Sequence, residues 1–196
     1  MTRNMVAALY IDPLGPYPQI VADWYDAERD ARTYCGPHPV IAHPPCGPWG
    51  KMSHLCTMQD PALGPLGVEQ VRRWGGVLEH PAGSALWRHC GIPAPFRRVP
   101  MIAPHEWSLA VEQVRWGHPC QKLTWLLFVG VNPMTLGPIP PPRRATHVID
   151  DHGPGDAARR GLKHLPKRLR HITPPDFALW LARAAEGARP RHEPAP

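Results

Sequence analysis

The amino-acid sequence predicts an α/β protein with a Rossmann-like, mainly parallel sheet and flanking helices. Three observations support this prediction. The chain has 196 residues, which is enough for one domain with a substantial core. Short apolar runs alternate with short helical patterns. Several apolar runs stop at a proline, which cannot donate a hydrogen bond to a sheet. We therefore expect residues 1–186 to form a single α/β domain and residues 187–196 to be a disordered tail.

The first elements are two short strands and a helix. Residues 6–11 read as a buried strand that ends at Asp12-Pro13. Residues 20–24 read as a second strand, with Asp23 or Asp26 near its end. Residues 26–34 carry acidic side chains at their start, a pattern typical of a short helix.

The second group is centred on residues 40–42, an apolar run predicted to be a buried strand that ends at Pro44-Pro45. Residues 50–67 are polar and rich in Met, His and Pro, and we interpret them as a mobile loop. Residues 68–74 have helical spacing, and Gly75-Gly76 should end that helix.

The third group repeats the strand-to-proline pattern. Residues 77–78 open a strand that stops at Glu79-His80-Pro81, and residues 84–89 read as a short helix. We interpret residues 107–114 as an edge strand and residues 124–129 as a strongly predicted strand.

The last third combines a basic, proline-rich insertion with a helix. Residues 131–171 are predicted to be loop-like. Residues 176–186 have a helical apolar pattern, with Thr173 as the expected cap and Pro174 at the start.

Composition favours a cytoplasmic protein that binds a polyanion. No run of eighteen apolar residues occurs and the N-terminus has no long apolar segment, so we expect neither membrane insertion nor export. The five cysteines are expected to be free thiols. The net charge is +6, and the sequence pI is about 9.4. The basic residues concentrate in the C-terminal third, where we expect DNA contacts from Arg143, Arg144, Lys167, Arg168 and Arg170, together with Arg159, Arg160 and Lys163.

Cys46 follows a predicted strand on a stiff proline loop. Ligands bind at the carboxyl ends of strands in open α/β sheets, and a thiol held there can act as a nucleophile. The alternative is that Cys46 is a small buried hydrophobic residue, which is the common role of a free cysteine.

Three stretches in this order resemble the DNA cytosine C5-methyltransferases. Pro44-Pro45-Cys46 is similar to that family's Pro-Pro-Cys nucleophile loop. Leu78-Glu79-His80-Pro81 is similar to its Glu-Asn-Val segment, with His and Pro in place of Asn and Val. Residues 116–130 are similar to its Tyr-Gly-x-Pro-Gln-x-Arg-x-Arg strand, with Lys122 where an arginine is expected. Thr173-Pro174-Pro175 before the last helix is a weaker fourth similarity.

The resemblance implies a methyltransferase-like fold and methyl transfer to C5 of cytosine in DNA, as in a small enzyme of phage or prophage type. Cys46 would be the nucleophile that adds to C6, and Glu79 the acid that gives or shares a proton at N3. Lys122 and Arg115 would orient the base or a phosphate. The plain structural alternatives are that Glu79 caps the helix near Ser84 and that Arg115 and Lys122 are solvated.

The resemblance also implies S-adenosylmethionine as cofactor. The family's glycine-rich turn after the first strand is missing, because residues 12–17 offer only Gly15 among prolines. Proline removes amide donors that the cofactor's carboxylate would use. The candidate cofactor residues are Asp12 and Gly15 in this loop, and Asp23 or Asp26 for ribose hydroxyls.

Two other functions remain open. One is a catalytically silent, nucleic-acid-binding phage accessory protein that keeps the fold. The other is a zinc module, because His and Cys are paired at 35 and 38, 43 and 46, and 54 and 56. The prolines within the first two pairs and the lack of a clean pair-loop-pair spacing argue against zinc, so we expect no metal.

Overall fold

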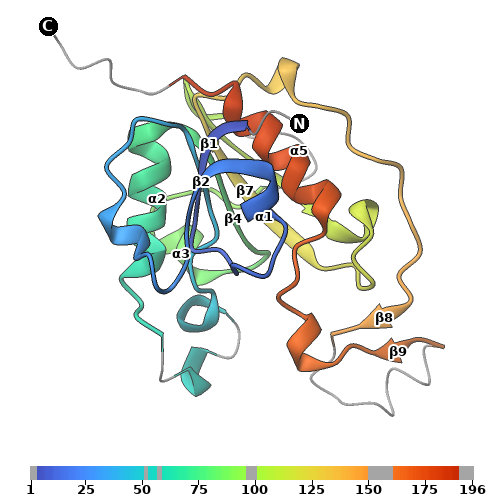
Figure 1. Cartoon of the computed structure of the whole chain (residues 1–196). Helices are drawn as coiled ribbons and strands as arrows, with labels where there is room; N and C mark the ends of the chain where they lie inside the picture. Colours follow the sequence, from blue (N-terminus) through green and yellow to red (C-terminus); the bar gives the residue numbers. More distant parts are fainter. Residues whose placement is uncertain (1–3, 51–52, 57–58, 96–100, 150–160, 190–196) are drawn as a thin grey trace, which may run out of the picture.

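The computed structural model describes residues 4–50, 53–56, 59–95, 101–149 and 161–189. A seven-stranded sheet forms its centre, with the strand order β2-β1-β3-β4-β7-β6-β5 (Figure 1). The strands are β1 (Asn4–Leu9), β2 (Val21–Tyr25), β3 (Val40–Ala42), β4 (Gly76–Pro81), β5 (Met101–Ala103), β6 (Glu106–Glu112) and β7 (Leu123–Val129). The α/β class is therefore confirmed.

The sheet is mixed, so the prediction of a mainly parallel sheet is wrong. Strands β2, β1, β3 and β4 are parallel, whereas β4 with β7, β7 with β6, and β6 with β5 pair antiparallel. A two-residue turn joins β5 to β6, and residues 113–122 join β6 to β7. Connections this short can join antiparallel neighbours, whereas a parallel pair needs a crossover of about a dozen residues or more. The reversal of β7 brings its first residues to the same edge as the carboxyl ends of β3 and β4.

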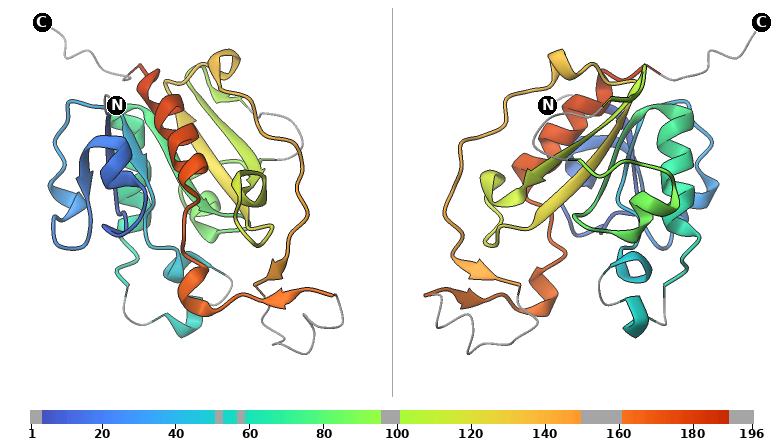
Figure 2. Two further views of the ribbon diagram at one scale, coloured as in Figure 1. Left: turned by 45° about the vertical axis from the view of Figure 1, so that its right-hand side comes forward. Right: turned by 180° about the vertical axis from the view of Figure 1, so that it is seen from behind.

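Two helical layers cover the sheet. Helices α1 (Tyr17–Ile20) and α5 (Pro175–Glu186) lie on one face, and α2 (Leu63–Trp74) and α3 (Ala85–His89) lie on the other (Figures 1 and 2). Each face has its own apolar cluster, because alternate side chains of a strand point to opposite faces. Ile41 and Phe128 pack with α5, whereas Ala42 and Leu78 pack with α2 and α3. The core is thus split into two layers by the sheet.

Close contact between β3 and β4 depends on glycine. Gly75 (φ +74°) ends α2 as predicted, and Gly76 (φ +116°) begins β4. A Cβ atom at Gly76 would lie 2.0 Å from the carbonyl oxygen of Val40. Only glycine fits this approach and this backbone conformation.

The N-terminal half deviates from the sequence prediction at two segments. Residues 26–34 contain only a 3₁₀ turn (Ala31–Thr33) rather than a helix, because the Asp26 carboxylate caps backbone N–H groups at 28 and 29 in a turn. The predicted loop 50–67 is too long, since α2 begins at Leu63 and a 3₁₀ turn spans Ser53–Leu55. Residues 51–52 and 57–58 lie outside the described residues.

The C-terminal half also differs in detail. Strand β6 is not at the edge, because β5 pairs with its outer side. Proline 174, not Thr173, occupies the N-cap of α5, and no side chain caps this helix. The predicted tail 187–196 begins with ordered residues: Ala188 is buried, and the Arg189 N–H donates to the Gly130 carbonyl at 2.9 Å. Residues 190–196 lie outside the described part of the chain.

The basic insertion contains a second, two-stranded parallel sheet, β8 (His147–Val148) with β9 (Lys163–His164). The 3₁₀ turn Lys167–Leu169 follows it. These elements lie at the same end of the molecule as the 3₁₀ turns Gly47–Trp49 and Ser53–Leu55, which follow β3 (Figures 1 and 2). Residues 150–160, with Arg159 and Arg160, are outside the described residues. In the described part of the chain, no helix has the length and apolar character to cross a membrane.

Candidate active site

The three motif segments meet at one end of the central strands, where β3 and β4 finish and β7 begins. Cys46 follows β3, Glu79 lies near the carboxyl end of β4, and Lys122 immediately precedes β7. Strand β4 is the neighbour of both β3 and β7, with Pro81 opposite Thr124. The charges of Glu79 and Lys122 both act on the pKa of Cys46. The three side chains therefore share one electrostatic environment.

Local sequence explains the position of Cys46. The two prolines before it end the strand, and its carbonyl accepts the Trp49 N–H at 3.1 Å to open a 3₁₀ turn. Gly47 is closely packed, because a Cβ there would lie 2.5 Å from the Cys56 sulfur unless that side chain moved. All five cysteines are free, as predicted.

Glu79 is held by a chain of buried side chains that the sequence analysis did not identify. The Nδ1 atom of His43 lies 2.9 Å from Oε2 of Glu79, and Nε2 of His43 lies 2.6 Å from the Tyr17 hydroxyl. Tyr17 is 2% exposed. Because a carboxylate only accepts, His43 donates to Glu79 through Nδ1, and its other ring nitrogen shares a hydrogen bond with the Tyr17 hydroxyl.

The other carboxylate oxygen is fixed by a second chain of hydrogen bonds. The amide nitrogen of Gln113 donates to Oε1 of Glu79 and to Oγ1 of Thr124, both at 3.0 Å. The Thr124 hydroxyl in turn donates to the Lys122 carbonyl at 3.1 Å. Each donor has a defined acceptor, so Glu79 accepts on both oxygens. Glu79 does not cap α3, whose N-cap is Ser84.

These contacts control the ionisation of Glu79. Burial alone would raise its pKa, but the hydrogen bond from His43 and the charges of His43 and Lys122 lower the pKa to about 2. The sequence analysis assigned Glu79 as an acid, whereas these contacts keep it a carboxylate. Its side chain is 12% exposed, so a ligand can still reach it.

Burial also shifts the pKa values of the Cys46 thiol and the Lys122 amine. Burial and the Glu79 carboxylate raise the pKa of Cys46, and Lys122 opposes this effect. Burial lowers the pKa of Lys122, although Glu79 and Cys46 act in the opposite direction. The Lys122 ammonium donates to the Ile172 carbonyl at 3.1 Å. Lys122 has a φ of +40°, so its backbone is held in an uncommon conformation beside the site.

His80 is placed on the opposite face of β4 from Glu79. Its side chain is fully buried, with its ring 6.2 Å from that of Trp87. Burial lowers the pKa of His80 to about 4. We assign it a packing role against the Pro45 segment rather than a chemical one.

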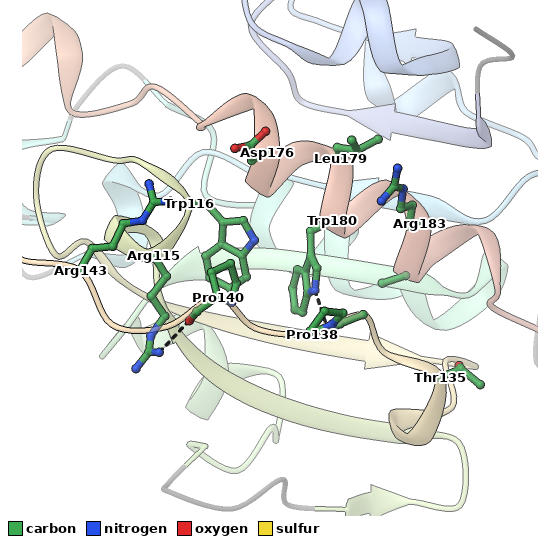
Figure 3. Close-up of a pocket in the computed structure, with 12 residues that line it drawn as sticks. Arg115, Trp116, Thr135, Pro138, Pro140, Arg143, Asp176, Leu179, Trp180 and Arg183 are labelled. Atoms are coloured by element: carbon green, nitrogen blue, oxygen red, sulfur yellow. Dashed lines mark hydrogen bonds between the residues drawn. The ribbon is translucent and has the colours of Figure 1, made fainter.

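Arg115 does not join this site. Its guanidinium donates to the Pro140 carbonyl at 2.9 Å and lies 3.7 Å from Glu112. It lines a cavity of about 500 Å³ between α5 and residues 135–143. Figure 3 shows the indole rings of Trp116 and Trp180 close together among the residues that line this cavity.

The residues predicted to bind S-adenosylmethionine do not fit that cofactor. In the loop after β1, the N–H groups of Leu14 and Gly15 already donate to Asp12. Its two prolines have no N–H to offer. Asp23 is ion-paired with Arg29 at 2.6 Å, and Asp26 accepts from its own turn. The loop therefore lacks the cluster of free amide donors that a cofactor carboxylate requires.

The predicted DNA-binding residues fall into two groups. Arg143 and Arg144 line a second cavity of about 220 Å³ beside His118, and Arg143 also lines the larger one. Lys167 and Arg168 are exposed on the 3₁₀ turn after β9. Arg170 is half-buried, with its guanidinium 3.2 Å from His164.

The zinc alternative gains no support from the geometry. In the part of the chain that the structure describes, no group of three or more His, Cys, Asp or Glu side chains could hold a metal ion. His43, a member of one predicted ligand pair, is instead bound to Glu79 and Tyr17.

Comparison with protein-family models, with curated proteins and with solved structures finds no match to this chain.

Proposed function

We propose that this chain is a DNA-modifying enzyme that attacks a pyrimidine base through Cys46 and changes the base at C5. One observation supports the proposal most: a thiol, a carboxylate and a half-buried amine come from the ends of three neighbouring strands on the same side of the sheet. Methyl transfer to cytosine is the specific reaction that the family resemblance implies.

The first step is addition of the Cys46 thiolate to C6 of the ring. A sulfur–carbon bond forms as the C5=C6 π electrons move into the ring, and C5 then takes a proton from water. Removal of a proton from C5 and departure of the thiolate restore the base. Without a group donor, the net result is exchange of the C5 hydrogen with solvent, which reports the covalent step and needs no cofactor.

Lys122 supports this step because its positive charge favours the anionic forms of Cys46 and Glu79. Its charge opposes the rise that burial causes in the pKa of Cys46. Glu79 accepts a hydrogen bond from the ring edge, and the contacts from His43 and Gln113 hold it in place. No step of the proposal involves S-adenosylmethionine, because the loop after β1 does not fit it.

DNA is the proposed carrier of the base, because basic side chains lie at the same end of the molecule as the site. The β8–β9 sheet and the turn that carries Lys167 and Arg168 share that end with the Cys46 loop (Figure 2). A base in a duplex would have to leave the helix to reach Cys46.

The test is deuterium exchange at C5 of pyrimidines in short single-stranded and duplex oligonucleotides, measured by mass spectrometry in heavy water. We expect exchange with the parent chain and none with Cys46→Ser. Cys90→Ser is the matched control, because Cys90 is also a free, half-buried cysteine with a pKa raised by burial. No exchange by the parent, or equal exchange by Cys46→Ser, contradicts the proposal.

DNA binding is tested separately by salt titration. Each phosphate neutralised by a cation contributes about 0.9 to the slope of log affinity against log salt for duplex DNA. The variant lacks three cations together: Lys167→Ala, Arg168→Ala and Arg170→Ala. We expect it to bind all sequences more weakly and with a shallower slope, whereas binding equal to the parent would remove these residues from the interface.

A further inference from the structure

Two adjacent cavities lie along residues 135–146. The larger one, of about 500 Å³, lies between α5 and residues 135–143, and the smaller one, of about 220 Å³, lies beside residues 117–119. Arg143 lines both cavities, so they are neighbours. We call the two cavities together the arginine groove.

The arginine groove holds more cations than anions. Its described lining includes four arginines and one acidic residue, which are Arg115, Arg143, Arg144, Arg183 and Asp176. Arg115 also lies 3.7 Å from Glu112, so its charge is partly neutralised. Within the described part of the chain, Arg143, Arg144 and Arg183 form no ion pair. Surplus cations that lack a partner indicate an anionic ligand.

The larger cavity also has an apolar lining. The rings of Trp116 and Trp180 lie 5.0 Å apart, and Leu179 and Pro138 line the same cavity. Figure 3 shows Arg143 and Arg183 on either side of the two indoles. Both indoles are largely buried, so a ligand ring would contact the small exposed part of each, together with Leu179 and Pro138. Apolar surface bordered by arginines suits a nucleotide, which joins a flat ring to a phosphate.

The smaller cavity has a buried histidine in its lining. His118 is 2% exposed, and its Nδ1 atom lies 3.0 Å from both the backbone nitrogen and the backbone oxygen of Cys120. Its Nε2 atom has no hydrogen-bond partner among the described residues. Buried polar atoms are normally hydrogen-bonded, so a ligand beside Arg143 and Arg144 could supply the missing partner.

A single turn of chain joins the arginine groove to the candidate active site. The 3₁₀ turn Gln113–Trp116 begins with Gln113, which donates to Glu79 at 3.0 Å. Arg115 and Trp116 of the same turn line the larger cavity. The groove and the site are therefore held in a fixed relation by residues that are adjacent in the sequence.

We propose that the arginine groove binds a single strand of DNA beside the modified base, with phosphates on Arg143 and Arg144 and an unpaired base in the larger cavity. This inference rests on DNA as the carrier in the proposed function, but it does not depend on the chemistry of Cys46. Two adjacent cavities suit a chain of several nucleotides better than one small ligand. A base can enter a cavity only when it is unpaired, so a duplex fits the groove less well.

The test is fluorescence anisotropy with a labelled single-stranded oligonucleotide and with the blunt duplex of the same sequence. We expect the parent chain to bind the single strand about tenfold more tightly or better. Arg143→Gln should weaken this binding by about fivefold or more and reduce the slope of log affinity against log salt by about 0.7, the value for one phosphate of a single strand. Arg73→Gln is the matched control, because Arg73 is also an exposed arginine but lies on α2, on the other face of the sheet.

The outcomes separate this inference from the proposed function. Equal binding of the strand by Arg143→Gln and the parent, or an equal loss in Arg73→Gln, overturns the groove as the site. Duplex binding as tight as strand binding overturns the preference for a single strand. Thymidine monophosphate bound as tightly as the strand, measured by calorimetry, overturns the polymer as ligand. Binding of the strand that depends on Arg143, without exchange at C5, supports the groove and overturns only the proposed chemistry of Cys46.

Discussion

Replacement of Glu79 by glutamine should reduce the stability of the protein in a strongly pH-dependent way. The carboxylate accepts hydrogen bonds on both oxygens, from His43 and Gln113. An amide accepts on only one side, so Glu79→Gln leaves one N–H facing another N–H. The variant also removes the charge that His43 and Lys122 stabilise.

The magnitude follows from the pKa of Glu79. Its decrease from 4.5 to about 2 corresponds to roughly 3 kcal/mol, at about 1.4 kcal/mol for each tenfold change in proton affinity. The folded-state pKa is lower than the unfolded one. The stabilisation is therefore fully present above about pH 5, and it is lost as the pH falls from 4.5 toward 2.

The assay is urea unfolding of parent and variant at intervals from pH 7 to pH 2.5. We expect a destabilisation of about 3 kcal/mol at pH 7 that shrinks steadily below pH 4.5. Glu69→Gln is the control, because Glu69 is exposed on α2 and has no hydrogen bond assigned. A difference for Glu79→Gln that stays constant across this range, or that equals the control, would refute the assignment of Glu79 as a buried, ionised acceptor.

Three further variants test other parts of the account. Tyr17→Phe removes the hydroxyl that contacts Nε2 of His43, and we expect it to lower the free energy of unfolding by about 1–3 kcal/mol. An unchanged midpoint of urea unfolding would mean that this hydrogen bond adds nothing to stability. Alkylation of Cys46 by iodoacetamide should be slow at pH 7 and slower still in Lys122→Met, as judged by peptide mass spectrometry; faster labelling in the variant would contradict the charge effect of Lys122. Gly76→Ala should destabilise the fold by more than about 3 kcal/mol, because a Cβ there would meet the β3 backbone at 2.0 Å. Gly83→Ala is its control, because Gly83 also has a positive φ (+79°) but no atom lies within 4 Å of the added Cβ.

Much of the sheet could be predicted from local sequence. The apolar runs at 40–42, 77–78 and 124–129 all belong to strands, and proline marks the ends of β3 and β4 because it cannot continue the ladder. The direction of β7 could not be predicted in this way. It depends on which strand β7 pairs with, and no short-range pattern encodes that choice.

The candidate site was predictable only in part. Cys46, Glu79 and Lys122 come from motif segments, and strand order then brings these segments together. The contact of His43 with Glu79 and Tyr17 was missed, and His43 was considered only as a zinc ligand paired with Cys46. The position of His43 directly after a predicted strand could have indicated a role at the site. Its partner Glu79, however, lies 36 residues away on β4, so local sequence does not show the contact. Arg115 failed to join the site because its side chain turns toward the 135–143 segment.

The most direct test of the account is to capture the bond between Cys46 and the base. Oligonucleotides with a single 5-fluoropyrimidine are suitable, because fluorine draws electrons from C6 and favours addition of the thiol. The reaction is quenched in acid, which slows removal of the C5 proton, and the product is analysed by intact mass and peptide mapping. The account predicts a one-to-one protein–DNA adduct whose modified peptide contains Cys46 and which is absent in Cys46→Ser. An adduct on another cysteine, or no adduct under conditions where DNA is bound, would contradict it.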